Sequence, residues 1–466
     1  MLRIFYFFVL PLLFLFGACS KEHLTNSQEA RIGTSSDSLY FDTVFTQEVS
    51  ITQSIRIYNQ NNQKIKLASI RLAGGDTSIF RINVNGESGP VVQNIEISAN
   101  DSIHVFVNTR VPQNSSHLPF IVEDSIIIVW NANQKKIKLS AWGQNARYIK
   151  NASLSGKHIW TSELPYVILG ELHVEKDAIL QIAKGTRVYC HANAPILIDG
   201  SIQVNGDTAA RDRIVFSGDR LDKPYKNLPS GWPGIYLREP SHDNSFAYTI
   251  IKNAYQGIIT EGQQNNPGKK LLLEQCIIDN IWDAGLLAIN SSAEVNNCLV
   301  SNCGKNIRLI YGGDYSFTHC TIASFSNQYF SHTEPVVFIT DAISNNNVVQ
   351  TAALSARFTN TICWGDGAMV NNEVVALKEG SNAYSVIFTY GLWRENEVSP
   401  NIDTENTYND IDPEFEETGG EQGKYNFHLK SSSPAIDKGL TTNLVVDLDG
   451  NPRIREIPDF GAYEKQ

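Results

Sequence analysis

We expect an all-β protein in which a β-sandwich precedes a long solenoid, and two patterns predict this class. Cys276, Cys298 and Cys320 lie 22 residues apart, and each opens a similar phrase, such as Cys276-Ile277-Ile278-Asp279-Asn280. A fixed repeat of this size indicates a solenoid with one turn per repeat. The repeats are punctuated by Asn and Gly and lack helical apolar spacing, which favours a right-handed parallel β-helix. Upstream, short alternating strands are typical of an antiparallel sandwich.

Residues 1–19 have the features of a lipoprotein signal peptide. Arg3 precedes a short apolar run from Ile4 to Phe16, which is too short to span a membrane, and small residues follow. The phrase from Leu15 to Cys19 resembles the lipobox of bacterial lipoproteins, which implies acylation of Cys19; plain secretion is the alternative. Acyl chains would anchor the protein to the outer membrane without spanning it, on the periplasmic side or at the cell surface.

The segment after Cys19 is polar and aperiodic over residues 20–33, and we expect a flexible tether there. Residues 34–148 alternate in short strands such as Ser54–Tyr58, which predicts an immunoglobulin-like β-sandwich. The start of this region, Phe41–Phe45, and its end, Leu139–Gln144, resemble the sandwich modules of surface lipoproteins from Bacteroidetes-type bacteria. No residue in the region suggests catalysis.

Residues 157–400 are expected to form the β-helix, and residues 401–466 a C-terminal capping segment. Phrases such as Leu169–Val174 resemble the opening coils of pectate-lyase-like β-helix proteins. Phrases such as Asp459–Glu464 resemble the tail that closes many bacterial β-helix surface proteins, because a solenoid needs its last open coil covered. Insertions at 263–270 and 328–350 are candidate binding loops, since inserted loops commonly form the binding side of a solenoid.

Two sets of residues should stack in successive coils, about 4.8 Å apart. The first set is expected to be buried free thiols, because three members cannot all pair, although disulfides are common in exported proteins. The second set should form an asparagine ladder inside tight turns, where Asn tolerates left-handed geometry. The first set is Cys276, Cys298 and Cys320, and the second is Asn253, Asn280 and Asn302.

The composition argues against several functions. The net charge is −11, and removing residues 1–18 would make it −12, which argues against binding nucleic acid. The sequence contains no His-Glu-x-x-His, Cys-x-x-Cys or Gly-x-Ser-x-Gly motif, so neither a zinc site nor a nucleophile elbow has support. We therefore expect no metal and no cofactor in a binding protein.

The candidate catalytic residues are Asp283, Lys305 and Arg308. Lys305 follows Asp283 by 22 residues, so the two should stand on neighbouring coils. The family resemblance implies that a lyase would use a Lys or Arg base, with carboxylates that hold Ca²⁺. The structural alternative is an exposed ion pair. A glycoside hydrolase needs two neighbouring carboxylates. It is less favoured, because the positions equivalent to Asp279 and Asp283 in the next coil are Ser301 and Lys305 rather than acids.

Trp282, Trp364 and Trp393 are candidate platforms for sugar rings, which stack on aromatic faces; core packing is the alternative. We expect a monomeric, non-catalytic cell-envelope lipoprotein that binds a polysaccharide or another envelope component. The competing hypothesis is a polysaccharide lyase, or a glycoside hydrolase, acting on uronate-containing chains. Ca²⁺ would be required only under the lyase hypothesis.

Overall fold

The computed structural model describes residues 23–466 except 347, 368, 397–398, 420–423 and 454–456. The predicted signal peptide and its lipid attachment site, Cys19, lie outside these residues. The described part of the chain is all-β, as predicted, with two short 3-10 segments, η2 (Gly75–Thr77) and η3 (Tyr225–Asn227), and no α-helix. No helix in that part has the length and apolar character needed to cross a membrane. The chain divides into two compact units, Met1–Asn145 and Ala146–Gln466.

The first unit consists of two mainly antiparallel sheets that enclose one apolar core. Buried and exposed residues alternate along most strands, as in β9, so each sheet turns one face inward. One sheet contains β1 (Leu24–Thr25), β3 (Ser38–Phe45), β5 (Lys64–Leu72), β8 (Val91–Ile97), β10 (Phe120–Trp130) and β11 (Asn133–Gln144). The other contains β2 (Ile32–Thr34), β4 (Gln53–Asn59), β6 (Phe80–Val84), β7 (Glu87–Gly89) and β9 (Ser102–Thr109).

The predicted tether at 20–33 is wrong for its described residues. Leu24 and Thr25 form β1 and pair with β5, and Ile32 begins β2 in the other sheet. Ala30 is buried, and its carbonyl oxygen accepts a hydrogen bond from the indole nitrogen of Trp130 at 2.8 Å. These strands are only two and three residues long, so their alternation is too short to recognise in the sequence.

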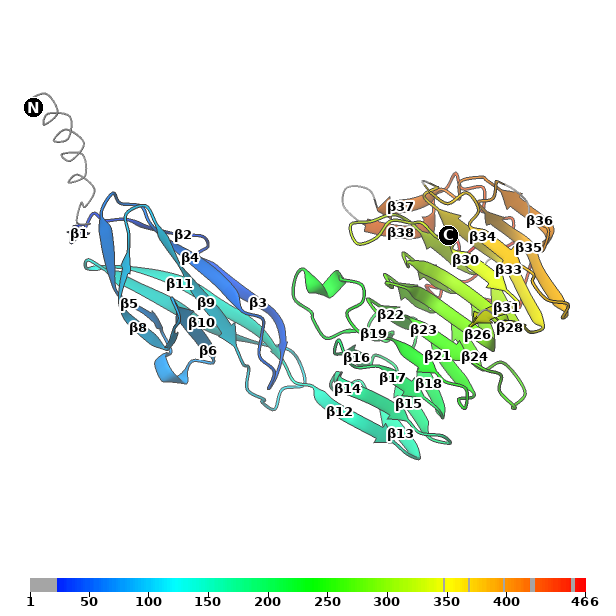
Figure 1. Ribbon diagram of the computed structural model, residues 1–466, viewed down its shortest axis with the longest axis horizontal. Helices are drawn as coiled ribbons and strands as arrows, with labels where there is room; N and C mark the ends of the chain where they lie inside the picture. Colours follow the sequence, from blue (N-terminus) through cyan, green and yellow to red (C-terminus); the bar gives the residue numbers. More distant parts are fainter. Residues whose placement is uncertain (1–22, 347, 368, 397–398, 420–423, 454–456) are drawn as a thin grey trace, which may run out of the picture. The chain divides into compact units, whose positions relative to one another are not determined.

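The second unit contains one parallel sheet that winds through successive coils (Figure 1). Its first half contains β12 (Arg147–Leu154), β13 (Lys157–Trp160), β14 (Tyr166–Val174), β15 (Ile179–Ala183), β16 (Arg187–Cys190), β17 (Ile196–Ile198), β18 (Ser201–Asn205), β19 (Ile214–Gly218), β20 (Ile235–Leu237), β21 (Asn244–Ala247), β22 (Thr249–Lys252), β23 (Ile258–Glu261) and β24 (Leu271–Glu274). Its second half contains β25 (Ile277–Asp279), β26 (Ala284–Asn296), β27 (Leu299–Ser301), β28 (Lys305–Thr318), β29 (Thr321–Ser324), β30 (Val337–Thr340), β33 (Leu354–Gly365), β34 (Val374–Leu377), β35 (Tyr384–Trp393) and β36 (Asp403–Asn409). Two antiparallel hairpins accompany it, formed by β31 (Ala342–Asn345) with β32 (Val348–Thr351) and by β37 (Phe415–Gly419) with β38 (Lys424–Leu429).

The strands of this sheet stack in three ladders, one for each side of the solenoid. The first ladder runs through β18, β21, β24 and the C-terminal half of β26. The second runs through β22, β25, β27 and β29. The third runs through β20, β23, the N-terminal halves of β26 and β28, and then β30 and β34. The sheet begins at β12 and ends at β36, so it extends beyond the predicted limits of 157 and 400 at both ends. The side chains of these outer rungs are mostly exposed or partly exposed, which hides the pattern in the sequence.

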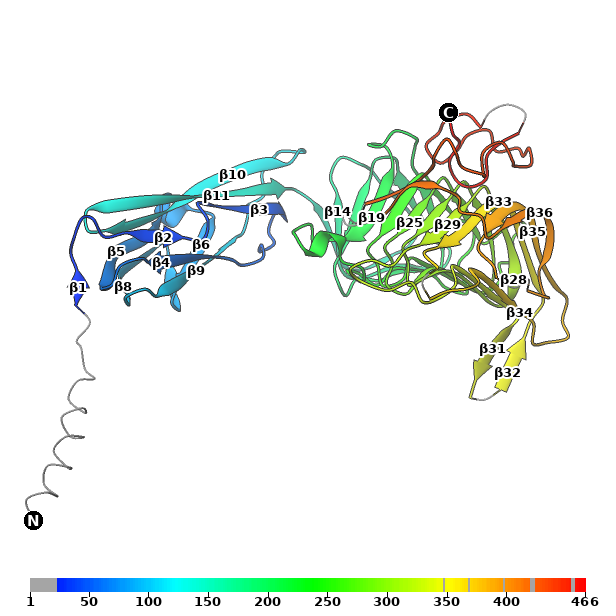
Figure 2. The same ribbon diagram turned by 90° about the horizontal axis from the view of Figure 1, so that it is seen from above.

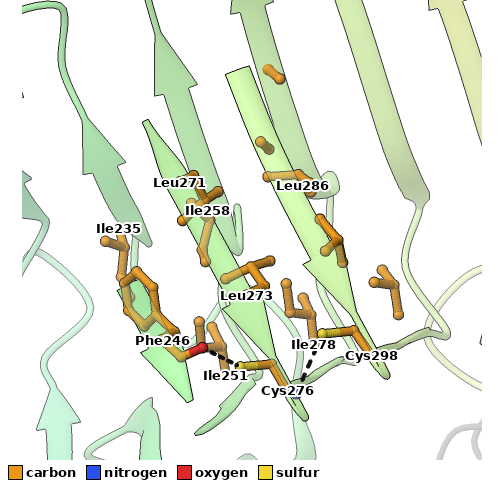
Figure 3. Close-up of a cluster of buried hydrophobic side chains, with 14 of the residues drawn as sticks. Ile235, Phe246, Ile251, Ile258, Leu271, Leu273, Cys276, Ile278, Leu286 and Cys298 are labelled. Carbon is orange, nitrogen blue, oxygen red and sulfur yellow. Dashed lines mark hydrogen bonds between the residues drawn. The ribbon is translucent and has the colours of Figure 1, made fainter. Parts of the chain in front are cut away.

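The 22-residue repeat is present in the register of the second ladder. Ile277 pairs with Leu299, and Leu299 pairs with Thr321, which places the cysteines before them at equivalent positions. All three cysteines are buried and unpaired, and the backbone nitrogen of Cys276 lies 3.4 Å from the sulfur of Cys298 (Figure 3). Burial raises the pKa of the Cys320 thiol to about 12. Burial therefore keeps the thiols of Cys298 and Cys320 protonated, and all three cysteines are core side chains.

The asparagine ladder forms only in part. Asn253, Asn280 and Asn302 all have left-handed backbone geometry, with φ of 60°, 56° and 48°. The amide of Asn280 donates to the side-chain oxygen of Asn253 at 2.8 Å, as a ladder requires. Asn302 instead donates to Asp279 at 3.3 Å. The ladder therefore consists of one hydrogen bond between amides. The asparagine of the next coil bonds to a carboxylate instead of an amide.

The C-terminal segment lies along the side of the solenoid, where the sequence predicted a cap over its last coil. Apolar tail residues such as Phe460 pack against outward side chains of the second ladder, including Leu299 and Ile362. The backbone nitrogen of Ala462 donates to the hydroxyl of Thr321 at 2.9 Å. Figure 2 shows this chain, in red, beside the strands of the second ladder. The predicted cap at 401–466 is therefore corrected to a lateral cover.

A buried lysine fastens the turns between the third and first ladders. The Lys270 side chain donates from Nζ to the carbonyl oxygens of Arg238 and Glu239, each at 2.9 Å, and to that of Glu261. Lys270 has no exposed surface, and burial lowers its pKa to about 8, although the nearby charges of Glu239 and Glu261 act to raise it. Lys270 is the last residue of the predicted insertion at 263–270, so these hydrogen bonds fix the end of that loop.

This pKa predicts a pH effect on stability. Between pH 8 and 10.5 the unfolded chain binds more protons at Lys270 than the folded chain does, so stability should rise with pH there. Relative to Lys270→Met, the wild type should gain up to about 1.4 kcal/mol per pH unit across this range. Urea unfolding of both proteins from pH 7.5 to 10 measures the difference. A difference that stays constant or falls would contradict the prediction.

Candidate functional site

A pocket of about 250 Å³ opens on the outward side of the third ladder. Three successive coils line it, through the start of β26, the start of β28, and β30 with the residues before it. Half of the lining residues are charged, namely Asp283, Lys305, Arg308 and Glu334. The other half are apolar, namely Ala284, Leu287, Ile310 and Phe338. The structure thus brings the three predicted catalytic residues together and adds Glu334.

The ion pair at the edge of the pocket follows from the 22-residue repeat. Nζ of Lys305 lies 2.9 Å from Oδ1 of Asp283, and Gln256 donates to Oδ2 at 3.0 Å. Burial acts to raise the pKa of Asp283, but the hydrogen bonds from Gln256 and Lys305 outweigh it and hold that pKa below its usual range. Asp283 is therefore an ionised, fully engaged carboxylate.

A second charge pair, between buried Arg308 and half-exposed Glu334, lines the same pocket. Nη2 of Arg308 lies 2.9 Å from Glu334, and Nη1 donates to the carbonyl oxygen of Pro335 at 3.0 Å. The guanidinium lies 5.3 Å from the centre of the Phe338 ring, a favourable cation–π distance. The Arg308 side chain is only 8% exposed, and burial lowers its pKa while Glu334 and Asp283 oppose that shift. Glu334 comes from the insertion predicted at 328–350, but nothing in the sequence singles out that residue.

Of the three predicted tryptophan platforms, only Trp282 is on the surface. It is 47% exposed and precedes Asp283 at the edge of the pocket. Trp364 is 6% exposed beneath the C-terminal segment, in the same apolar cluster as Phe460. Trp393 is fully buried, and its indole nitrogen donates to Glu395 at 2.8 Å. The predictions for Trp364 and Trp393 are therefore wrong, since neither can stack with a sugar.

Tyr255, which is not among the residues predicted from the sequence, is 44% exposed. The backbone nitrogen of Trp282 donates to Ala254, and that of Asp283 donates to Tyr255, so Tyr255 and Trp282 occupy adjacent coils at one turn. The 27 residues between them equal the spacing from Thr249 to Cys276, which could have identified the pair. The two aromatic side chains extend the site beyond the pocket.

The chemistry available in this site is hydrogen bonding and apolar contact. Each carboxylate is paired with a cation, so acid–base catalysis would require one of these pairs to open. Among the residues that the structure describes, no group of three or more His, Cys, Asp or Glu side chains is placed to hold a metal ion. The charged groups can contact ligand hydroxyls, and the exposed rings can stack on a sugar.

Comparison with known proteins assigns no family. No protein-family model matches the chain, and no curated protein matches it. Among solved structures, the catalytic domain of Agl-KA has 9% identity and a TM-score of 0.28, over 76% of each chain. XylC, solved in complex with xylose, has 8% identity and a TM-score of 0.24, over 80% of this chain and 76% of that one.

A family 123 glycoside hydrolase from Clostridium perfringens has 11% identity and a TM-score of 0.19. The match covers 26% of this chain and 31% of the hydrolase, so the chain spans about a third of that protein's length. At these identities and TM-scores, the three structures assign neither a family nor an activity to this protein.

Proposed function

We propose that this protein binds carbohydrate on the third ladder of its solenoid without changing it chemically. The observation that carries the proposal is the pocket at Asp283 and Lys305, with Trp282 and Tyr255 exposed beside it. Paired charges and half-exposed aromatic rings are the groups that contact the hydroxyls and the apolar faces of sugars. Both carboxylates are already paired, which favours binding over catalysis.

The proposal includes a place for the protein in the cell. The second unit is a right-handed parallel β-helix, the first is an immunoglobulin-like sandwich, and the chain is anchored to the outer membrane through acylated Cys19. Its ligand is a polysaccharide or another component of the cell envelope, and the protein acts as a monomer. The lipobox-like phrase and the parallel sheet support this arrangement.

The proposal predicts that the aromatic pair contributes to binding. Residues 20–466 should bind members of an immobilised glycan panel, and Trp282→Ala should weaken binding about tenfold, which corresponds to about 1.4 kcal/mol. Tyr255→Ala should have a similar effect. Trp142→Ala is the matched control, because Trp142 is 49% exposed in the first unit. Failure of the folded wild type to bind across a broad panel would contradict the proposed function.

A polysaccharide lyase is the second candidate, because buried Arg308 shares the pocket with two carboxylates. Incubation with acidic polysaccharides, with Ca²⁺ or with a chelator, would reveal a lyase through ultraviolet absorbance of unsaturated products. A calcium-dependent rise that Arg308→Met abolishes would establish the lyase. A flat trace from protein that binds glycans would support the binding function.

A further inference from the structure

The charges in the pocket are already balanced. Lys305 is paired with Asp283, and Arg308 is paired with Glu334, so the four charged side chains sum to zero. One member of each pair makes a further hydrogen bond: Asp283 accepts one from Gln256, and Arg308 donates one to the carbonyl oxygen of Pro335. A charged ligand therefore meets no net opposite charge, and a cation that drew Glu334 away would leave Arg308, which is only 8% exposed, without its counterion, which is costly. The pocket is therefore suited to a neutral ligand.

The apolar lining has no polar groups to satisfy, and only the Phe338 ring has a charged neighbour, the guanidinium of Arg308. Leu287, Arg308 and Phe338 occupy the same position in three successive coils, and Ile310 lies two residues beyond Arg308 on the same side of its strand. Leu287, Ile310 and Phe338 are partly exposed at this surface. A ring that presents only hydroxyls here would bury some of them against carbon, without hydrogen-bond partners. A methyl group would instead gain from leaving water.

The pocket has room for a single sugar ring. Its volume of about 250 Å³ is slightly below the roughly 300 to 1,000 Å³ of pockets that hold drug-sized ligands. The exposed Trp282 and Tyr255 lie outside this volume and can contact a neighbouring ring. The occupant is therefore one sugar unit of a longer glycan, with the charged pairs contacting its hydroxyls.

We propose that the pocket selects a neutral sugar ring that carries a methyl group. This inference rests on the carbohydrate-binding function proposed above and names the class of its ligand. The methyl group can be the C5 methyl of a 6-deoxyhexose or the acetamido methyl of an N-acetylhexosamine, and both offer the same contact to Leu287, Ile310 and Phe338.

The test compares matched pairs of sugars by titration calorimetry. D-Fucose is compared with D-galactose, which differs from it by one hydroxyl, and N-acetylglucosamine is compared with glucose; glucuronate is the charged control. The preferred methyl sugar should bind at least fourfold more tightly than its partner, the factor expected for one buried methyl group. The two pairs distinguish a 6-deoxy sugar from an N-acetyl sugar.

Variants of the lining assign the preference to the pocket. Leu287→Asn and Ile310→Thr should remove the methyl preference, so that the methyl sugar binds no more tightly than its matched partner. Ile159→Asn is the matched control, because Ile159 is 60% exposed on the first ladder and should leave the preference intact. If sugars bind in a manner that depends on Trp282 but show no methyl preference, or prefer glucuronate, this inference is overturned. If no sugar or glycan binds at all, the proposed function fails as well.

Discussion

A chain that ends at Asp410 is expected to lose most of its soluble yield and to bind a dye specific for exposed apolar surface. The C-terminal segment covers outward side chains of the second ladder, and Leu299, Ala323 and Ile362 are each at most 6% exposed beneath it. Without residues 411–466 these side chains would form a continuous apolar surface, which promotes association. Soluble fraction, light scattering and dye fluorescence measure the effect.

The matched control removes only Lys465 and Gln466. Both residues are exposed, and their contacts are one backbone hydrogen bond to Asp459, the ion pair of Lys465 with Glu416 at 3.4 Å and a hydrogen bond from Gln466 to Pro452 at 3.3 Å. Because these contacts lie at the surface, this variant should behave like the wild type. Arg453→Ala tests the same contact by a point change, because Arg453 joins Glu464 at 3.0 Å and Asn297 at 2.8 Å. A soluble, dye-negative chain ending at Asp410 would show that the segment is dispensable.

The lateral position of this segment was missed, although the sequence contains a signal for it. Strands of the second ladder are apolar on both faces, as in Ile277-Ile278 and Leu299-Val300. One of these faces points into the solenoid core, and the other must also be covered. The repeat alone predicts the coils, but only this double apolarity indicates which side of the solenoid a later segment will cover.

The candidate site was predictable where the repeat is regular and not elsewhere. Lys305 follows Asp283 by one period, and the structure pairs their side chains. Glu334 lies in an insertion, where counting by 22 no longer applies. The predictions for two tryptophans were wrong for different reasons. Trp393 pairs with Cys363 on the inward side of its strand. Trp364 points outward but is covered by the C-terminal segment. Strand position alone cannot reveal that cover.

The variant Glu373→Ala is expected to lower the free energy of unfolding by about 3 to 5 kcal/mol, because it breaks a fully buried pair. Oε1 of Glu373 lies 2.9 Å from Nε2 of His332, and the two side chains are 0% and 1% exposed. Oε2 accepts a hydrogen bond from the backbone nitrogen of Val336 at 3.2 Å. Removing the carboxylate leaves that nitrogen and the imidazole unsatisfied in the interior. A Cβ at position 365 would clash with Glu373, so only glycine fits at that position beside the buried pair.

The same change should alter the pocket, because Glu334 lies between His332 and Val336 in the chain. Hydrogen exchange of the Val336 amide should accelerate, and any glycan binding that depends on the Arg308–Glu334 pair should weaken. Glu373→Gln keeps the shape and one acceptor, so it should cost less than Glu373→Ala. Glu405→Ala, at an exposed position in β36, is the matched control and should change stability by less than about 0.5 kcal/mol. If Glu373→Ala left both the unfolding midpoint and the Val336 exchange rate unchanged, the buried pair would have no role in holding this wall of the pocket.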